Sequence, residues 1–211
     1  MLDEVAEGQF ATPQAYVQHY GIVDLIAVHA VHLTGDEIAL LADAGCHAVH
    51  CPSSNLKLAS GIAAPDRLLN AGVNVGLGTD GAASNNRLDL FTEMRLAALL
   101  AKKAGGDPTA MPAHVVLEMA TVRAARALGI DDRVGTLAPG KRADMTAVNL
   151  DALELSPCYD PLSHLVYAAG REHVSHVWVD GELAVERGQL TRLDARELTA
   201  KAAYWKDRIR S

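Results

Sequence analysis

Two side chains in this sequence stand where a reaction could take place. His29 ends an apolar run that begins at residue 22, and Asp80 follows a second apolar run over residues 73–79. Such runs are typical of parallel strands that are covered on both faces. Because the carboxyl ends of the strands in an α/β barrel meet at one open face, both side chains are expected at the same mouth. An aspartate at that place can bind a metal ion or carry a proton.

These residues also allow a structural interpretation. Asp80 is compatible with a helix cap and His29 with a hydrogen-bonded core histidine, and only the strand-end position favours the functional reading. His32 lies three residues beyond His29 and is expected to line the rim of a pocket rather than to bind a metal. His47 and His50 are three positions apart on a short strand, so they should point to opposite faces. His50 is expected to lie nearer the pocket, although a structural role is favoured for it.

Other catalytic motifs are absent from the sequence. It contains no GxSxG, no GxxxxGK[ST] and no HExxH. Gly76-Leu77-Gly78 lacks the third glycine of a dinucleotide fingerprint, and the HxE and PCxxC pattern of one class of zinc deaminases does not occur.

Strands and helices that would position the two residues alternate along the chain. Thr34 and Glu37 predict a capping box, and the stretch 52–61 is expected to be a polar loop. Strands are expected over 22–29, 47–51 and 73–79, and helices over 13–20, 35–44, 65–71, 88–103 and 112–128. Three strand-then-helix units imply a parallel sheet with right-handed crossovers.

The pattern changes after Gly129. A turn-rich segment over residues 134–144 precedes short strands at 145–150 and 176–185, and Asp180-Gly181 is typical of a hairpin turn. An amphipathic helix is expected over 193–209.

Composition excludes several classes of protein. The 211 residues carry a net charge of −7 without a basic block, so nucleic acid is not expected as a partner. No apolar run reaches the roughly 20 residues that span a bilayer, so no membrane role is expected. The three cysteines (Cys46, Cys51 and Cys158) form no CxxC pair and follow no leader peptide, so we expect free thiols and a cytoplasmic location.

Four stretches of the sequence resemble the metal-dependent amidohydrolases. They are Val-His-Ala-Val-His-Leu over 28–33, Val-His-Cys-Pro-Ser-Ser-Asn-Leu-Lys-Leu-Ala-Ser-Gly-Ile-Ala over 49–63, Leu-Gly-Thr-Asp-Gly-Ala-Ala-Ser-Asn-Asn over 77–86, and Glu-Met-Arg-Leu-Ala over 93–97. Within that family they are most similar to the 5-methylthioadenosine/S-adenosylhomocysteine deaminases, and chlorotriazine hydrolases and guanine deaminases share part of the pattern. Residues 135–144 and 177–181 resemble segments of the family's small β-domain.

The resemblance implies an α/β fold, namely the C-terminal part of a (β/α)8 barrel with about strands six to eight, together with part of a small β-sandwich. Three parts are then expected along the chain. They are a partial amidohydrolase barrel over 1–130, the C-terminal portion of a composite β-sandwich over 131–192, and a C-terminal helix over 193–211.

The resemblance also implies a mechanism. Asp80 would be a catalytic residue and the metal ligand, His29 would orient the attacking hydroxide, and both would contact the substrate together with His32. The implied cofactor is one divalent metal ion, in the first place Zn²⁺, whose bound hydroxide attacks C6 of an adenine-type nucleoside and releases ammonia. The implied substrate is a small purine-nucleoside-like molecule, and the full-length protein is expected to be a homo-oligomer. Hydrolysis of another ring C–N or C–Cl bond and a catalytically inactive remnant are the alternatives.

Several motifs of the family are missing. The sequence has no HxH of strand one and no HxxE of strand five, so the chain resembles the C-terminal half of a longer enzyme. A zinc ion needs about four ligands, so the chain alone is expected to be inactive. Three strands do not close a barrel, so we also expect uncovered apolar faces and aggregation or oligomerisation of the isolated chain.

Overall fold

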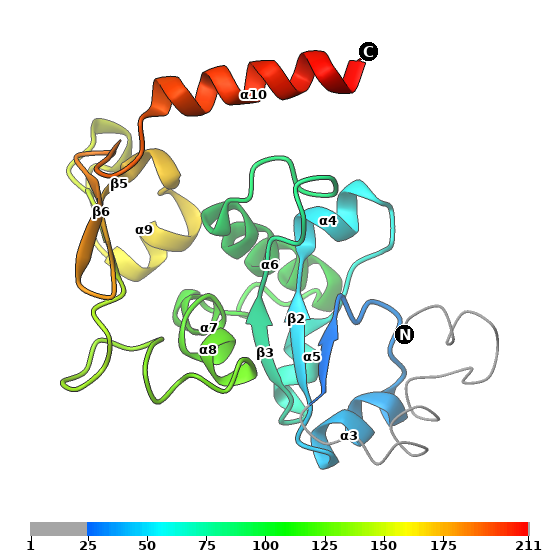
Figure 1. The fold of residues 1–211 in the computed structure, drawn as a ribbon. Coiled ribbons are helices and arrows are strands. Elements are labelled where there is room, and N and C mark those ends of the chain that lie inside the picture. The colour runs from blue at the N-terminus through cyan, green and yellow to red at the C-terminus, as the bar shows by residue number, and fades with distance from the viewer. Residues whose placement is uncertain (1–24, 211) are drawn as a thin grey trace.

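A computed structural model describes residues 25–210 of the chain (Figure 1). Its first part contains a parallel sheet with the strand order β1-β2-β3, formed by β1 (Ile26–Val28), β2 (His47–His50) and β3 (Asn74–Leu77). Ile26 pairs with His47, and His47 pairs in turn with Asn74. The predicted parallel sheet is therefore confirmed. The helix predicted at 13–20 and the first residues of the strand predicted at 22–29 lie outside the described residues.

Two connections cross between these strands. Helix α3 (Gly35–Asp43) joins β1 to β2 and has the predicted capping box, in which Glu37 N donates to Thr34 Oγ1 and Thr34 N donates to Glu37 Oε2. Helices α4 (Pro52–Lys57) and α5 (Pro65–Asn70) lie between β2 and β3. The loop predicted over 52–61 is thus wrong in its first half. Pro52 occupies the first helical position, where its missing N–H costs no hydrogen bond.

Three helices follow β3. They are α6 (Leu90–Gly105), α7 (Ala113–Met119) and α8 (Val122–Ala127). The single helix predicted over 112–128 is wrong, because Thr121 between α7 and α8 has φ −131° and ψ −99°. The break allows α8 to lie against β3. A Cβ at Gly76 would come within 3.1 Å of Ala124 Cα, so a larger residue would push α8 away from β3 by a few tenths of an ångström.

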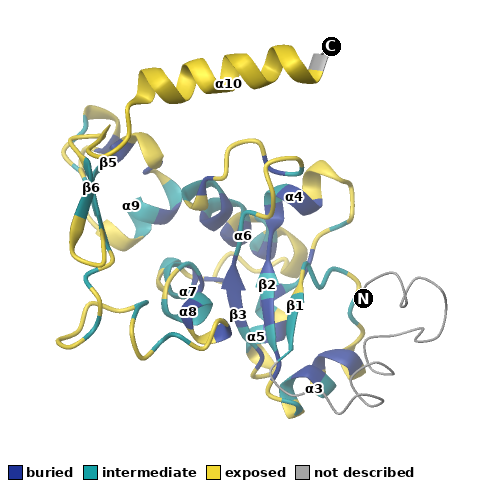
Figure 2. Ribbon diagram, in the orientation of Figure 1, coloured by how far each residue is buried: buried dark blue, intermediate teal, exposed yellow. Residues whose placement is uncertain are grey.

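The core of the first part lies between the sheet and its helices, as the dark blue ribbon in Figure 2 shows. Apolar side chains from both the strands and the helices are almost fully buried there, and they include Leu41, Val75, Ala97, Val116 and Met119. Burial of each large apolar side chain contributes about 1.5 to 3 kcal/mol, so this core holds the strand ends in place.

The second sheet is antiparallel and follows chain order. It consists of β4 (Met145–Val148), β5 (Val174–Val179), β6 (Glu182–Glu186) and β7 (Gln189–Leu190). The predicted hairpin is confirmed, since Asp180 and Gly181 join β5 to β6 with φ values of 52° and 80°. No residue of these four strands is buried.

Helix α9 (Pro161–Tyr167) and two short 3-10 turns, η1 (Leu153–Leu155) and η2 (Arg171–His173), connect β4 to β5. Helix α9 packs against α6 and α7 and so links the second sheet to the first part of the chain. The predicted terminal helix is present as α10 (Ala195–Arg210), and all of its residues up to Ile209 are exposed (Figure 2). Among the described helices, none is both long and apolar enough to cross a membrane.

Candidate functional site

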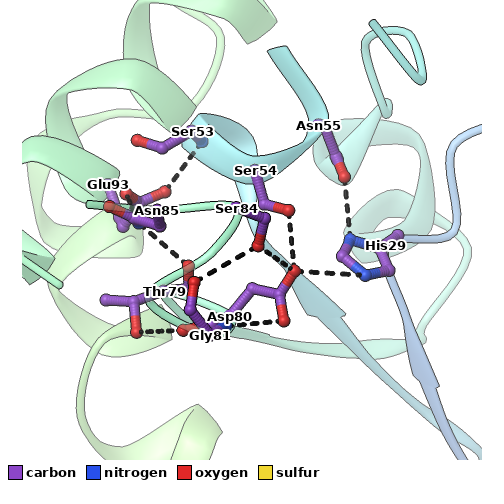
Figure 3. A network of polar contacts seen from close by, with 10 residues as sticks. All are labelled: His29, Ser53, Ser54, Asn55, Thr79, Asp80, Gly81, Ser84, Asn85 and Glu93. Atoms are coloured by element: carbon purple, nitrogen blue, oxygen red, sulfur yellow. Dashed lines mark hydrogen bonds and ion pairs between the residues drawn. The ribbon is translucent and has the colours of Figure 1, made fainter. Parts of the chain in front are cut away.

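His29 and Asp80 meet at the carboxyl end of the parallel sheet (Figure 3). His29 directly follows β1, and Asp80 lies three residues beyond the end of β3. His29 Nε2 is 3.8 Å from Asp80 Oδ2, and the two side chains are 39% and 34% exposed. The sequence predicted this convergence from two strand ends that are 51 positions apart. A small molecule can therefore reach both groups.

Both residues have left-handed backbone conformations. The φ angle is 70° at His29, 48° at Ala30 and 60° at Asp80. Residues other than glycine rarely adopt such angles, which cost about 1 to 2 kcal/mol each. His29 N donates to Val49 O at 2.9 Å and so continues the pairing of β1 with β2. The neighbouring backbone thus holds the histidine in its unusual conformation.

Three donors converge on the Asp80 carboxylate. Ser54 Oγ and Ser84 Oγ each donate to Oδ2 at 2.7 Å, and Gly81 N donates to Oδ1 at 2.7 Å. These hydrogen bonds lower the pKa of Asp80 to about 2, and the one from Ser54 contributes most. The carboxylate is therefore ionised at neutral pH, and one lone pair of Oδ1 is still free to bind a cation or a proton.

Asn55 orients the His29 ring. The ring nitrogen Nδ1 lies 2.8 Å from Asn55 Oδ1, which can only accept a hydrogen bond. Nδ1 therefore donates to this oxygen, which leaves Nε2 on the side of Asp80. His29 can accept or return a proton at the mouth of the sheet.

His50 and Cys51 lie beneath this pair. His50 is 3% exposed, and both of its ring nitrogens are buried without a hydrogen-bond partner. Burial lowers the pKa of His50 to about 4, and the charge of His29 adds a smaller effect in the same direction. The ring is therefore neutral at physiological pH. Burial also raises the pKa of Cys51 to about 11, assisted by the charges of Asp80 and Glu93. Cys51 is therefore a protonated thiol and not a nucleophile.

His32 does not join the cluster in any contact among the described residues. Its side chain is exposed and lies beside Gly61, where a Cβ would come within 3.4 Å of His32 Cε1. Its substrate-binding role stays a prediction, as do the roles assigned to His29 and Asp80. Cys46, Cys51 and Cys158 are free thiols, as expected.

Ser54, Asn55 and Ser84 are site residues that sequence reasoning missed. Ser54 and Asn55 lie on α4, in the stretch that was predicted to be a loop. The signal that could have located them is Pro52 directly after a strand, because proline often begins a helix. Ser84 lies four residues after Asp80 in a turn, and its hydroxyl returns to the carboxylate.

The described residues do not form a complete metal site. No group of three or more His, Cys, Asp or Glu side chains between residues 25 and 210 is close enough to hold a metal ion. The free lone pair of Asp80 and the imidazole of His29 are nevertheless the donor types that zinc-class ions bind. A complete metal site would need ligands beyond these two.

The fold agrees with a comparison against known families. Residues 2–184 match the amidohydrolase family, and the chain therefore belongs to that family. The predicted resemblance and the amidohydrolase type of fold are confirmed, whereas the assignment to barrel strands six to eight stays a prediction.

Two relatives carry the name 5-methylthioadenosine/S-adenosylhomocysteine deaminase. The protein of Moorella thermoacetica is 49% identical over 202 residues, which cover 95% of this chain and 47% of the relative. The protein of Teredinibacter turnerae is 48% identical over 184 residues, which cover 86% of this chain and 42% of the relative. The chain thus spans a little under half the length of these relatives.

Solved structures with the same fold include two that contain zinc. An adenosine deaminase of Xanthomonas campestris with bound zinc is 48% identical with a TM-score of 0.93, over 99% of this chain and 48% of that chain. The atrazine chlorohydrolase of Arthrobacter aurescens in complex with zinc is 32% identical with a TM-score of 0.85, over 92% of this chain and 43% of that chain.

Proposed function

We propose that this chain supplies the part of a deaminase that carries His29 and Asp80, and that the substrates are adenine-type nucleosides such as 5-methylthioadenosine and S-adenosylhomocysteine. The observation that carries the proposal is the approach of His29 Nε2 to within 3.8 Å of Asp80 Oδ2 at an accessible strand-end mouth. The names of the relatives that are 48% and 49% identical support this substrate class.

A divalent metal ion of the zinc type belongs to the proposal, with Asp80 as one of its ligands. The zinc in the two similar solved structures supports this assignment. Such an ion lowers the pKa of a bound water molecule and so supplies a nucleophile at neutral pH. Residues beyond the described part of this chain would complete its coordination.

The remaining chemistry falls to the side chains of this chain. Ser54 and Ser84 hold Asp80 Oδ2 and Gly81 N holds Oδ1, so the remaining lone pair of Oδ1 can bind the metal ion or, when it leaves that ion, take up a proton from the attacking water. Asn55 accepts a hydrogen bond from His29 Nδ1, which leaves Nε2 to orient the attacked ring through a hydrogen bond. Release of ammonia then requires that Asp80 return its proton to the leaving amino group.

The deaminase assignment is favoured over triazine hydrolysis by identity. The two named deaminase relatives are 48% and 49% identical to this chain, against 32% for the atrazine chlorohydrolase. This chain matches less than half of each of these proteins. A substrate panel therefore has to test the assignment directly.

The test is reconstitution. The chain is produced together with the N-terminal segment of the Xanthomonas adenosine deaminase that it does not match, in the presence of zinc. We expect release of ammonia from 5-methylthioadenosine and S-adenosylhomocysteine, and none when either segment is omitted. Guanine and a chlorotriazine complete the panel. Turnover of one of these compounds, with both nucleosides left intact, would refute the proposed substrate class.

A further inference from the structure

Glu93 is a buried carboxyl group beneath the site that no catalytic step uses. It lies on α6 and is fully buried, and both of its oxygens accept hydrogen bonds (Figure 3). Oε2 accepts from Ser53 N at 3.0 Å, and Oε1 accepts from Asn85 Nδ2 at 2.8 Å. These two donors belong to different segments, one before Asp80 in the sequence and one after it. The side chain of Glu93 thus connects α6 to both of these segments.

The first segment is α4. Ser53, which donates its backbone N–H to Glu93, directly precedes Ser54, whose hydroxyl donates to Asp80 Oδ2 at 2.7 Å. Asn55 follows and accepts from His29 Nδ1 at 2.8 Å. The hydrogen bond to Glu93 therefore fixes the turn of helix that contacts both Asp80 and His29.

The second segment is the turn that carries Asp80. Asn85 Nδ2 donates to Glu93 Oε1 and also to Thr79 O at 2.9 Å, the carbonyl directly before Asp80. Asn85 N donates to Gly81 O at 2.9 Å, the residue directly after it. The backbone and side chain of Asn85 thus close the turn around Asp80, which has a left-handed backbone conformation. Glu93 holds the side-chain amide of Asn85 in place.

From these contacts we infer that Glu93 is a positioning residue, which sets Asp80 and Ser54 in register by holding Ser53 and Asn85 at once. Glu93 does not touch the reacting atoms. It acts by two routes. Through Ser53 it places Ser54, whose hydroxyl donates to the Asp80 carboxylate, and through Asn85 it holds the backbone at Thr79 and Gly81 on either side of Asp80. Misplacement of a catalytic group by about 1 Å can cost about 100-fold in rate, so such a brace matters for turnover. The consequence for catalysis rests on the proposed function, whereas the placement of Asp80 does not.

The test compares two buried glutamates. Glu93→Gln keeps the shape of the side chain but turns an NH2 group toward one of the two donors. Glu37→Gln is the matched control, because Glu37 is also buried and caps α3 through Thr34, far from Asp80 along the chain. Both variants are expected to lose stability. Only Glu93→Gln should lower kcat of the reconstituted enzyme, by about 10- to 100-fold with little change in KM.

A spectroscopic measurement separates positioning from stability. Gly81 N–H donates to Asp80 Oδ1, so its amide signal in the NMR spectrum of the full chain reports on where the carboxylate lies. The signal should shift in Glu93→Gln and stay in place in Glu37→Gln. If Glu93→Gln does not fold, Asn85→Ala is expected to give the same two effects and replaces it.

An unmoved Gly81 signal, or a kcat within about twofold of the parent in an active assembly, overturns the inference. A parent assembly without deaminase activity refutes the proposed function instead. The Gly81 signal then decides the positioning role alone.

Discussion

The same dipeptide, Asp-Gly, occurs at two turns of this chain with different consequences. Asp80-Gly81 follows β3 and Asp180-Gly181 joins β5 to β6, and both aspartates are left-handed, with φ values of 60° and 52°. Asp80 accepts from two serine hydroxyls and one backbone N–H, and its side chain is 34% exposed. Asp180 contacts Arg142 at 3.0 Å, and its side chain is 62% exposed.

The two turns differ in how well the sheet next to each of them is packed. The residues behind Asp80 belong to a sheet that is packed against helices, so side chains from distant segments are held within hydrogen-bond distance of the carboxylate. The sheet that contains Asp180 has no buried residue in its four strands, so the turn reverses the chain and its carboxylate makes an exposed ion pair with Arg142. A turn motif therefore becomes a site only where a core fixes the donors around it.

The largest effect is expected when the charge of Asp80 is removed, in comparison with the same change at Asp180. In the reconstituted enzyme, Asp80→Asn should lower kcat/KM by about 1,000-fold, because the amide can neither accept the proton nor neutralise a bound cation. Asp180→Asn keeps the turn and removes only an exposed ion pair, so it should change kcat/KM by less than about twofold. Steady-state kinetics on 5-methylthioadenosine measures both values. Equal losses in the two variants would contradict the role given to Asp80.

Truncation of one leucine in each sheet region tests the contrast in packing. Leu41 is 1% exposed on α3, whereas Leu190 on β7 is 46% exposed. Leu41→Ala should cost about 2 to 5 kcal/mol of the free energy of unfolding, because it removes buried methyl groups and leaves a cavity. Leu190→Ala should cost less than about 1 kcal/mol. Pulse proteolysis in urea gives both values, and a larger loss at Leu190 would refute the contrast.

The pH dependence of stability should come in part from His50. Its pKa falls from 6.5 to about 4 on folding, so the unfolded chain binds more protons between these values. Stability should therefore decrease as the pH falls from about 6.5 to about 4, by up to about 3 kcal/mol. His50→Leu should flatten this decrease. His176→Leu, on β5, is the control and should retain it, and pulse proteolysis at several pH values distinguishes them.

The smallest effect concerns the carboxylate itself. Ser54→Ala removes the hydrogen bond that contributes most to lowering the pKa of Asp80. The pKa of Asp80 should therefore rise from about 2 toward 3.8, by about one unit. The lowered pKa of Asp80 stabilises the folded parent chain above pH 3.8, and this stabilisation is lost as the pH falls from 3.8 to about 2. Between these two pH values the free energy of unfolding of Ser54→Ala should therefore fall less than that of the parent chain. A carboxyl-carbon NMR titration of the parent chain and of Ser54→Ala measures the shift.

Local sequence signals predicted the elements well. The capping box at Thr34 and Glu37 and the hairpin at Asp180-Gly181 depend on contacts between near neighbours, and the three parallel strands were predicted from continuous apolar runs. The failures occurred where packing overrides local preference. The helix that should have run through Thr121 breaks so that α8 can approach Gly76, a partner about 45 positions away that no local pattern reveals.

The sequence by itself determined the class of fold, the two strand ends that bear His29 and Asp80, and the resemblance to amidohydrolases, because each follows from residue types in short stretches. Only the tertiary structure decided which side chains surround them. Ser54 reaches Asp80 and Asn55 reaches His29 across 26 positions of the chain. The physical reason is that a hydrogen bond depends on distances within a few tenths of an ångström, and such distances are set by the packing of the core against α4 and β3 rather than by any one segment.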